Sequence, residues 1–271
     1  MICRRLASII AIVVAVTAPT LSWGQSILLQ IKPHVGDTLE VKLDQTVEMT
    51  GTMVCARAAG CPVSSRRMTT VTEVFSKAIV QSIGRNGAHV LAVTDSIRTA
   101  SSRGAKVGRL HRVKTRNDTV QLRVSKEGGA EVVDANASAE LRAVFGQMPA
   151  TLSDKPVRIG GKWNREMRIP IAGETGALGM VRATFQLDSL GPNGDIAFIS
   201  MKGTLSHDRD GSDSEVYGSM TGSIQLDRRL AWITETRAEI DLTSMVSPVA
   251  GAAPMRVHTR VTQLLKAGPA R

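Results

Sequence analysis

Aromatic residues are scarce in this sequence: four Phe, three Trp and one Tyr account for 3% of its 271 positions. Proteins that bind single-stranded nucleic acid rely on aromatic side chains as stacking platforms. The scarcity argues against nucleic acid as a partner, although the formal net charge is +10. A basic balance favours anionic partners such as membrane head groups or polyanions, and equally it keeps a protein soluble and monomeric.

Motifs of known catalytic and metal sites are missing as well. The histidines are scattered, and none lies at a His-Glu-x-x-His or His-x-x-x-His spacing, which would place two ligands on one helical face. The nearest approach to a Gly-x-Ser-x-Gly nucleophile elbow, residues 218–222, has its serine misplaced. We therefore expect no catalytic residue, metal or cofactor. A hydrolase built from residues distant in sequence is the least favoured alternative, because triads are defined by geometry.

One acidic segment, His207 to Glu215, could offer carboxylate oxygens to a hard cation such as calcium. Its order of glycine and acidic residues departs from the calcium-loop pattern, and Arg209 places a positive charge among the ligands. A polar turn with Asp210-Gly211 at its tip is the ordinary interpretation.

No apolar run is long enough to cross a bilayer as a helix, which takes about 20 residues. The best candidate, residues 6–16, follows two arginines and is soon interrupted by Pro19. Small residues then stand three and one before a cut after Gly24, which is typical of a cleavable signal peptide over residues 1–24. We therefore expect a periplasmic or secreted protein without a transmembrane span, the alternative being an uncleaved anchor.

Cysteine is also rare in this sequence, and one of the three cysteines, Cys3, lies in the expected signal peptide. In an oxidising compartment the remaining pair, Cys55 and Cys61, is predicted to form a disulfide. Five residues separate them, which suits the tip of a hairpin. A redox pair or a zinc site is less favoured, because the spacing is not Cys-x-x-Cys and no Cys or His cluster completes a zinc set.

Strand patterns dominate the rest of the chain. Leu39, Val41 and Leu43 alternate with polar residues, which predicts a strand with one buried and one wet face. Residues 120–133 and 224–233 each look like a hairpin. The exception is a segment whose apolar residues follow helical spacing and end before a proline. These residues are Leu141, Val144, Phe145 and Met148.

The segments on the two sides of this expected helix resemble each other. Residues 35–39 (Val-Gly-Asp-Thr-Leu) recur as residues 159–163 (Ile-Gly-Gly-Lys-Trp), and residues 82–87 recur as residues 189–194. Matches in one order indicate a duplicated unit. We therefore expect an all-β fold of two related antiparallel lobes, sandwich or open-barrel like. The expected divisions are a first lobe at 25–135 with the disulfide hairpin as an insertion, a linking helix at 136–150 and a second lobe at 151–271.

The second lobe opens with Leu152, Lys155-Pro156-Val157 and Ile159-Gly160-Gly161, followed after one residue by Trp163. This opening resembles the Val-Gly-Asp-x-Trp-like strand entries of a family of exported bacterial β-proteins of uncharacterised function. Gly161 stands where that family has an acidic residue, and Leu152 is not followed by proline. The resemblance covers about residues 26–266. It implies a fold and an envelope location, and it supplies no catalytic residues.

Basic residues gather between positions 98 and 116, where seven of them occur without an acidic residue. Such a local field could hold phosphorylated lipid head groups or an envelope polyanion. A run of this kind is also common in a solvated loop or in an edge strand protected from aggregation. The candidate anion-binding residues are Arg98, Arg103, Lys106, Arg109, Arg112, Lys114 and Arg116.

These features favour a non-catalytic binding or interaction module of the envelope, with an anionic surface as its partner. The alternative is a carrier of an apolar or lipid-like ligand in a β cavity. The sequence contains eleven methionines, which can form an adaptable apolar lining and can equally fill an ordinary core.

The cysteine pair gives a direct test of the expected compartment and hairpin. We expect a thiol reagent to label no cysteine in the unfolded, unreduced mature protein and to label both after reduction. Labelling of both before reduction would contradict the Cys55–Cys61 disulfide.

Overall fold

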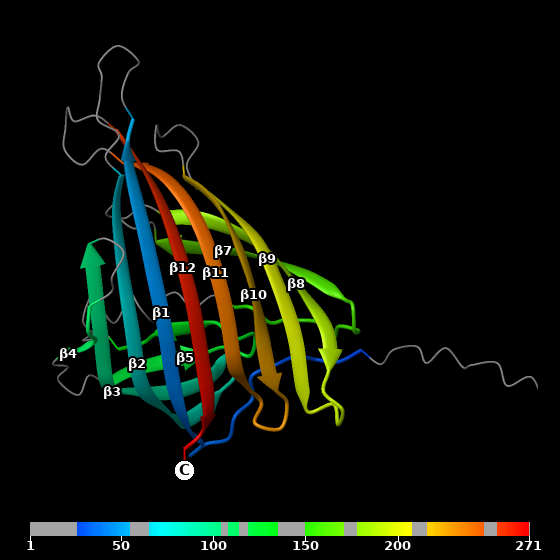
Figure 1. The fold of residues 1–271 in the computed structure, drawn as a ribbon. Coiled ribbons are helices and arrows are strands. Elements are labelled where there is room, and N and C mark those ends of the chain that lie inside the picture. Colours follow the sequence, from blue (N-terminus) through cyan, green and yellow to red (C-terminus); the bar gives the residue numbers. More distant parts are fainter. Residues whose placement is uncertain are drawn as a thin grey trace, which may run out of the picture.

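The computed structural model describes residues 26–54, 65–103, 108–113, 119–134, 150–170, 178–207, 216–246 and 254–270. These residues form one antiparallel sheet of twelve strands, which confirms the all-β expectation (Figure 1). No helix in this described part is long and apolar enough to cross a membrane. Four expected features lie outside the described residues: the signal peptide, the Cys55–Cys61 disulfide, the helix over residues 137–148 and the acidic residues 208–215.

The two halves of the chain contribute six strands each to the sheet. The first half provides β1 (Thr38–Met53), β2 (Ser65–Gly84), β3 (Gly87–Arg103), β4 (His111–Val113), β5 (Thr119–Val124) and β6 (Ala130–Val132). The second half provides β7 (Lys162–Pro170), β8 (Leu178–Leu190), β9 (Ile196–His207), β10 (Val216–Asp227), β11 (Trp232–Val246) and β12 (Met255–Pro269).

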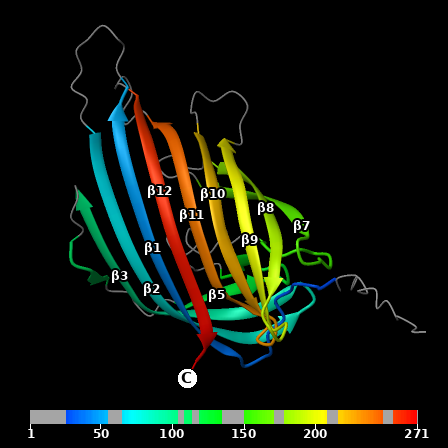
Figure 2. The same cartoon turned by 45° about the vertical axis from the view of Figure 1, so that its right-hand side comes forward.

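The two expected lobes are continuous halves of a single sheet. Its order is β6-β5-β3-β2-β1-β12-β11-β10-β9-β8-β7, with β4 attached to β3. The halves join where β1 pairs with β12, from Leu39–Pro269 to Met53–Met255. Figures 1 and 2 show the sheet curling, so that β5 lies behind the strands β12 and β11. Within the described residues β6 pairs only with β5 and β7 only with β8, so the sheet stays open at that seam.

The sequence matches between the halves correspond to the same local structure. Before β1, Gly36 has φ +91° and its N–H donates to the carbonyl of Val80 at 2.9 Å. Before β7, Gly160 has φ +81° and its N–H donates to the carbonyl of Leu187 at 2.6 Å. Left-handed backbone of this kind favours glycine. Val80 and Leu187 each precede an irregularity in the pairing of their strand, so both halves repeat one strand entry.

The apolar core fills one end of the curled sheet, which we name the closed end. There the inner faces of β3, β5, β8, β9 and β10 supply side chains that are almost completely buried. Two segments outside the strands complete the core, because Leu29 and Leu152 are 0% exposed. The N–H of Ile31 donates to the carbonyl of Lys126 and the N–H of Lys32 to that of Ala231, so the N-terminal segment joins two distant turns.

Trp163 helps to bridge the open seam at this end. Its ring stacks on Phe185 with centroids 5.7 Å apart, and its Nε1 donates to the carbonyl of Thr151 at 2.8 Å. The N–H of Thr151 in turn donates to the carbonyl of Glu127 in the turn between β5 and β6. Like Leu39 in β1, Trp163 is the second residue of the strand that opens its half.

Glycines on the inner face account for part of the curvature. A Cβ atom at Gly218 or Gly222 of β10 would collide with the carbonyl oxygen of Asp241 or Arg237 on β11. Glycine within a strand marks a bend or a close approach of neighbouring backbone. The two glycines therefore let β11 approach β10 closely where the sheet turns.

Replacing Gly222 tests this role. We expect Gly222→Ala to destabilise the protein by about 2–3 kcal/mol, in the range for overpacking, because the new methyl group meets backbone that cannot yield. Gly268→Ala in β12 is the matched control, since nothing lies within 4 Å of its Cβ position. Urea denaturation compares the two. Equal midpoints would contradict the assigned bend.

Replacing Trp163 tests the bridge across the seam. We expect Trp163→Ala to cost about 3 kcal/mol through lost stacking and burial. Trp163→Phe keeps a ring on Phe185 and removes only the indole donor, which costs about 1 kcal/mol. Chemical denaturation followed by circular dichroism gives both values. An unchanged curve for Trp163→Ala would show that the closed end does not depend on this contact.

Candidate functional site

The sheet has two chemically different faces. Leu39 is 5% exposed and Val41 packs against the core, so odd-numbered residues of β1 lie on the inner face, which carries the core. Residues opposite one another in an antiparallel pair point to the same side. The register therefore carries the inner face from β1 to β2 and β12.

Along β2 the inner face becomes less covered with distance from the closed end, whereas on β12 Val257 and Thr259, near the other end, are 6% and 7% exposed. Along β2 the exposed fraction is 1% for Val80, 8% for Ala78 and 42% for Met68. Met53, the last residue of β1, is 48% exposed. We name this end of the sheet the open end.

Between the two ends, five half-buried aliphatic residues on the inner face lie outside the core cluster. We name them the inner wall: Leu43, Val47, Val74, Val261 and Leu265. They form two rungs, because Leu43 is opposite both Val74 and Leu265, and Val47 is opposite Val261. A polar pair, Gln45 and Gln263, separates these two rungs.

At the open end the inner wall continues into four methionines, Met49, Met53, Met68 and Met255. We name this group the methionine rim. Met49 is opposite Met68, and Met53 is opposite Met255. A Cβ atom at Gly51 would lie 2.8 Å from the sulfur of Met255, so this glycine leaves room for the methionine to cross β1. Methionine is flexible and polarisable, which suits it to adaptable apolar surfaces.

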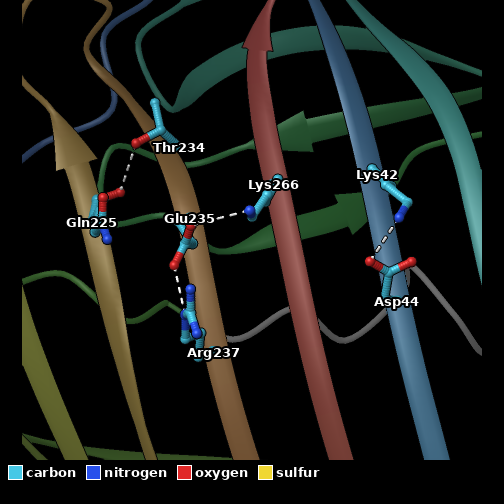
Figure 3. Close-up of polar contacts among 7 residues, drawn as sticks. All are labelled: Lys42, Asp44, Gln225, Thr234, Glu235, Arg237 and Lys266. Atoms are coloured by element: carbon cyan, nitrogen blue, oxygen red, sulfur yellow. Dashed lines mark hydrogen bonds and ion pairs between the residues drawn. The ribbon is translucent and has the colours of Figure 1, made fainter.

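The outer face is charged, and several of its charges are paired, as Figure 3 shows for part of it. On β1, Lys42 lies 2.9 Å from Asp44. On β11, Glu235 lies 2.6 Å from Arg237 and 3.9 Å from Lys266 of β12, with its side chain only 16% exposed. Figure 3 also shows Thr234, whose hydroxyl donates to the carbonyl of Gln225 at 3.4 Å where the pairing of β10 with β11 shifts.

The structure brings only part of the basic run together. Lys106, Lys114 and Arg116 lie outside the described residues, Arg103 ends β3, and Arg109 is exposed. Arg98 and Arg112 are opposite each other on β3 and β4.

Arg98 is already engaged by its neighbours on the outer face. It lies 3.7 Å from Glu73 and over the ring of Phe75 at 5.3 Å. Arg112 donates to the carbonyl of Asp95 at 3.4 Å. The run as an anion-binding site therefore stays a prediction.

A hollow of about 360 Å³ lies at the tips of two hairpins, β2–β3 and β5–β6. Its lining mixes polar and apolar surface, and its arginine, Arg123, is paired with Glu131 at 2.6 Å. The hollow does not match the apolar cavity that a carrier would need. The hollow is lined by Asn86, Arg123, Ser125, Gly129, Ala130 and Glu131.

No group of three or more metal-ligating side chains occurs within the described residues.

The eleven methionines of the sequence suggested an apolar lining, but the sequence alone did not show which of them lie together. Two segments of the sequence indicate this apolar face: one contains Leu43, Val47 and Met49 at odd positions, and the other contains Val257, Val261 and Leu265 at odd positions. They become one surface only through the pairing of β1 with β12.

No protein-family model matches the sequence, and no curated protein matches it. Among solved structures, one on lipid–protein interactions in lipovitellin is similar at a TM-score of 0.50 and 10% identity, covering 89% of this chain and 26% of that chain. An outer membrane channel from Pseudomonas putida F1 reaches a TM-score of 0.25 at 9% identity, covering 89% and 98%. The outer membrane protein OprG from Pseudomonas aeruginosa reaches 0.13 at 10% identity, covering 89% and 100%. The first similarity shows a similar fold alone, and the other two TM-scores are too low to show a similar fold.

Proposed function

We propose that this chain is a non-catalytic binding protein of the bacterial envelope that holds an apolar, lipid-like ligand against its inner wall. The observation that carries the proposal is the half-buried inner wall, which is continuous with the core at one end and with the exposed methionine rim at the other. The expected signal peptide supplies the envelope location.

The physical reason is the cost of leaving this surface in water. Apolar surface costs about 25 cal/mol per Å² when exposed, and soluble monomers rarely leave a contiguous apolar patch of more than a few hundred Å² uncovered. A ligand that covers the inner wall removes this cost. Gln45, Gln263, Thr70 and Thr72 share this part of the inner face, so such a ligand also lies beside hydrogen-bonding groups.

The dimensions suit a long chain. Met53 is ten positions after Leu43 on β1, and a strand rises about 3.3 Å per residue, so this part of the inner face is about 33 Å long. The hydrocarbon core of a whole bilayer is about 30 Å thick, so an acyl chain from one leaflet fits within that length. The fold similarity to lipovitellin is compatible with this use of an open sheet.

The other candidate, an interaction with an anionic surface through the basic run, has less support. Arg98 is paired with Glu73, and the outer charges of β1, β11 and β12 pair among themselves. Exposed charge pairs of this kind leave little net field for a partner.

A pair of double variants tests the proposal. Val47 and Val261 are opposite each other on the inner face, and the next rung, Thr46 and Thr262, lies on the outer face. We expect Val47→Gln/Val261→Gln to weaken binding of a fluorescent long-chain fatty acid about 30-fold. This corresponds to about 2 kcal/mol for two half-buried valines.

The matched control, Thr46→Gln/Thr262→Gln, changes the same strands one residue away and should bind like the unmodified protein. Thermal unfolding of both variants shows that each remains folded. Equal affinity in the two variants, or no binding by the unmodified protein, would contradict an apolar site on the inner wall.

A further inference from the structure

The methionine rim has a positive charge beside it that no described residue pairs. Arg66 of β2 is opposite Gly51, which places it on the inner face next to Met53 and Met68. Arg66 is exposed, and no ion pair joins it to any described residue. The next residue, Arg67, lies on the outer face and is paired with Glu48 at 3.0 Å. Neighbouring arginines on one strand therefore differ in face and in pairing.

The charge of Arg66 is not balanced from within the sheet. All acidic residues of β1 and β2, namely Glu40, Asp44, Glu48 and Glu73, occupy outer-face positions, and β12 has no acidic residue. The inner faces of these three strands thus carry no carboxylate. The chain has a formal net charge of +10. A further arginine, Arg103 of the basic run, is opposite Met68.

An arginine at the mouth of an apolar surface has a defined preference. Its guanidinium forms paired, charge-assisted hydrogen bonds with a carboxylate or phosphate. An apolar chain on the inner wall and an anionic group at Arg66 lie on one face, and Met49, Met68 and the buried Thr259 form the rung between Val47 and Arg66. The two features together match an amphiphile.

Building on the proposed function, we propose that the ligand is a single-chain anionic amphiphile. Its hydrocarbon chain lies on the inner wall, and its carboxylate or phosphate head lies against Arg66 at the methionine rim. Arg66 is then a specificity-determining residue: it distinguishes an anionic amphiphile from a neutral amphiphile of the same length.

The test compares three probes of equal chain length, dodecanoate, dodecyl phosphate and dodecanol, in the mature protein and in two variants. We expect Arg66→Gln to weaken binding of dodecanoate and dodecyl phosphate about tenfold and to leave dodecanol unchanged. Arg67→Gln, the matched control on the outer face, should change none of the three. Arg66→Lys should retain most of the preference, because it retains the charge.

The outcomes separate this inference from the proposed function. If Arg66→Gln leaves the ratio of dodecanoate to dodecanol affinity unchanged while dodecanol still binds, the role of Arg66 is wrong and the inner wall remains supported. If none of the three probes binds, the proposed function itself fails. Inorganic phosphate should not compete with dodecyl phosphate. Competition at equal concentration would show that Arg66 binds a free anion, and the amphiphile would be wrong.

Discussion

The pairing of β1 with β12 is the interaction on which the rest of the structure depends. It joins the first strand of one half to the last strand of the other along their whole length, from Leu39–Pro269 to Met53–Met255. Without it, each half would end in a long edge with unpaired backbone groups, which favours aggregation. With it, the two halves share one inner face, and apolar residues distant in sequence lie opposite one another.

The division of this surface follows from strand geometry and from where the charges stand. A strand period of two places Lys42, Asp44 and Glu48 on one side of β1 and Leu43 and Val47 on the other. Outer-face charges pair within a strand, as Lys42 does with Asp44, and across strands, as Arg67 does with Glu48, whereas the core cluster of the inner face lies at the closed end. The same sheet therefore carries paired charges outside and a half-buried, largely aliphatic wall inside.

The local parts of this fold could be predicted from the sequence, and the surface could not. Alternation at Leu39, Val41 and Leu43 predicted a strand, and the repeated Val-Gly-Asp and Ile-Gly-Gly entries predicted matching turns, which Gly36 and Gly160 form. Two lobes were expected because a repeat does not reveal that β1 and β12, at opposite ends of the chain, pair. The sequence made Arg98 a candidate for binding an anion, but the pairing of β2 with β3 places Glu73 opposite it. Nonlocal pairing decided each of these features.

Photo-crosslinking with a fatty acid that carries a diazirine near the end of its chain tests the central claim most directly. We expect crosslinked residues on the inner face of β1, β2 and β12, at Leu43, Val47, Val74, Val261 or Leu265. Crosslinks on the outer face of these strands, or at the hollow beside Asn86, would contradict binding to the inner wall.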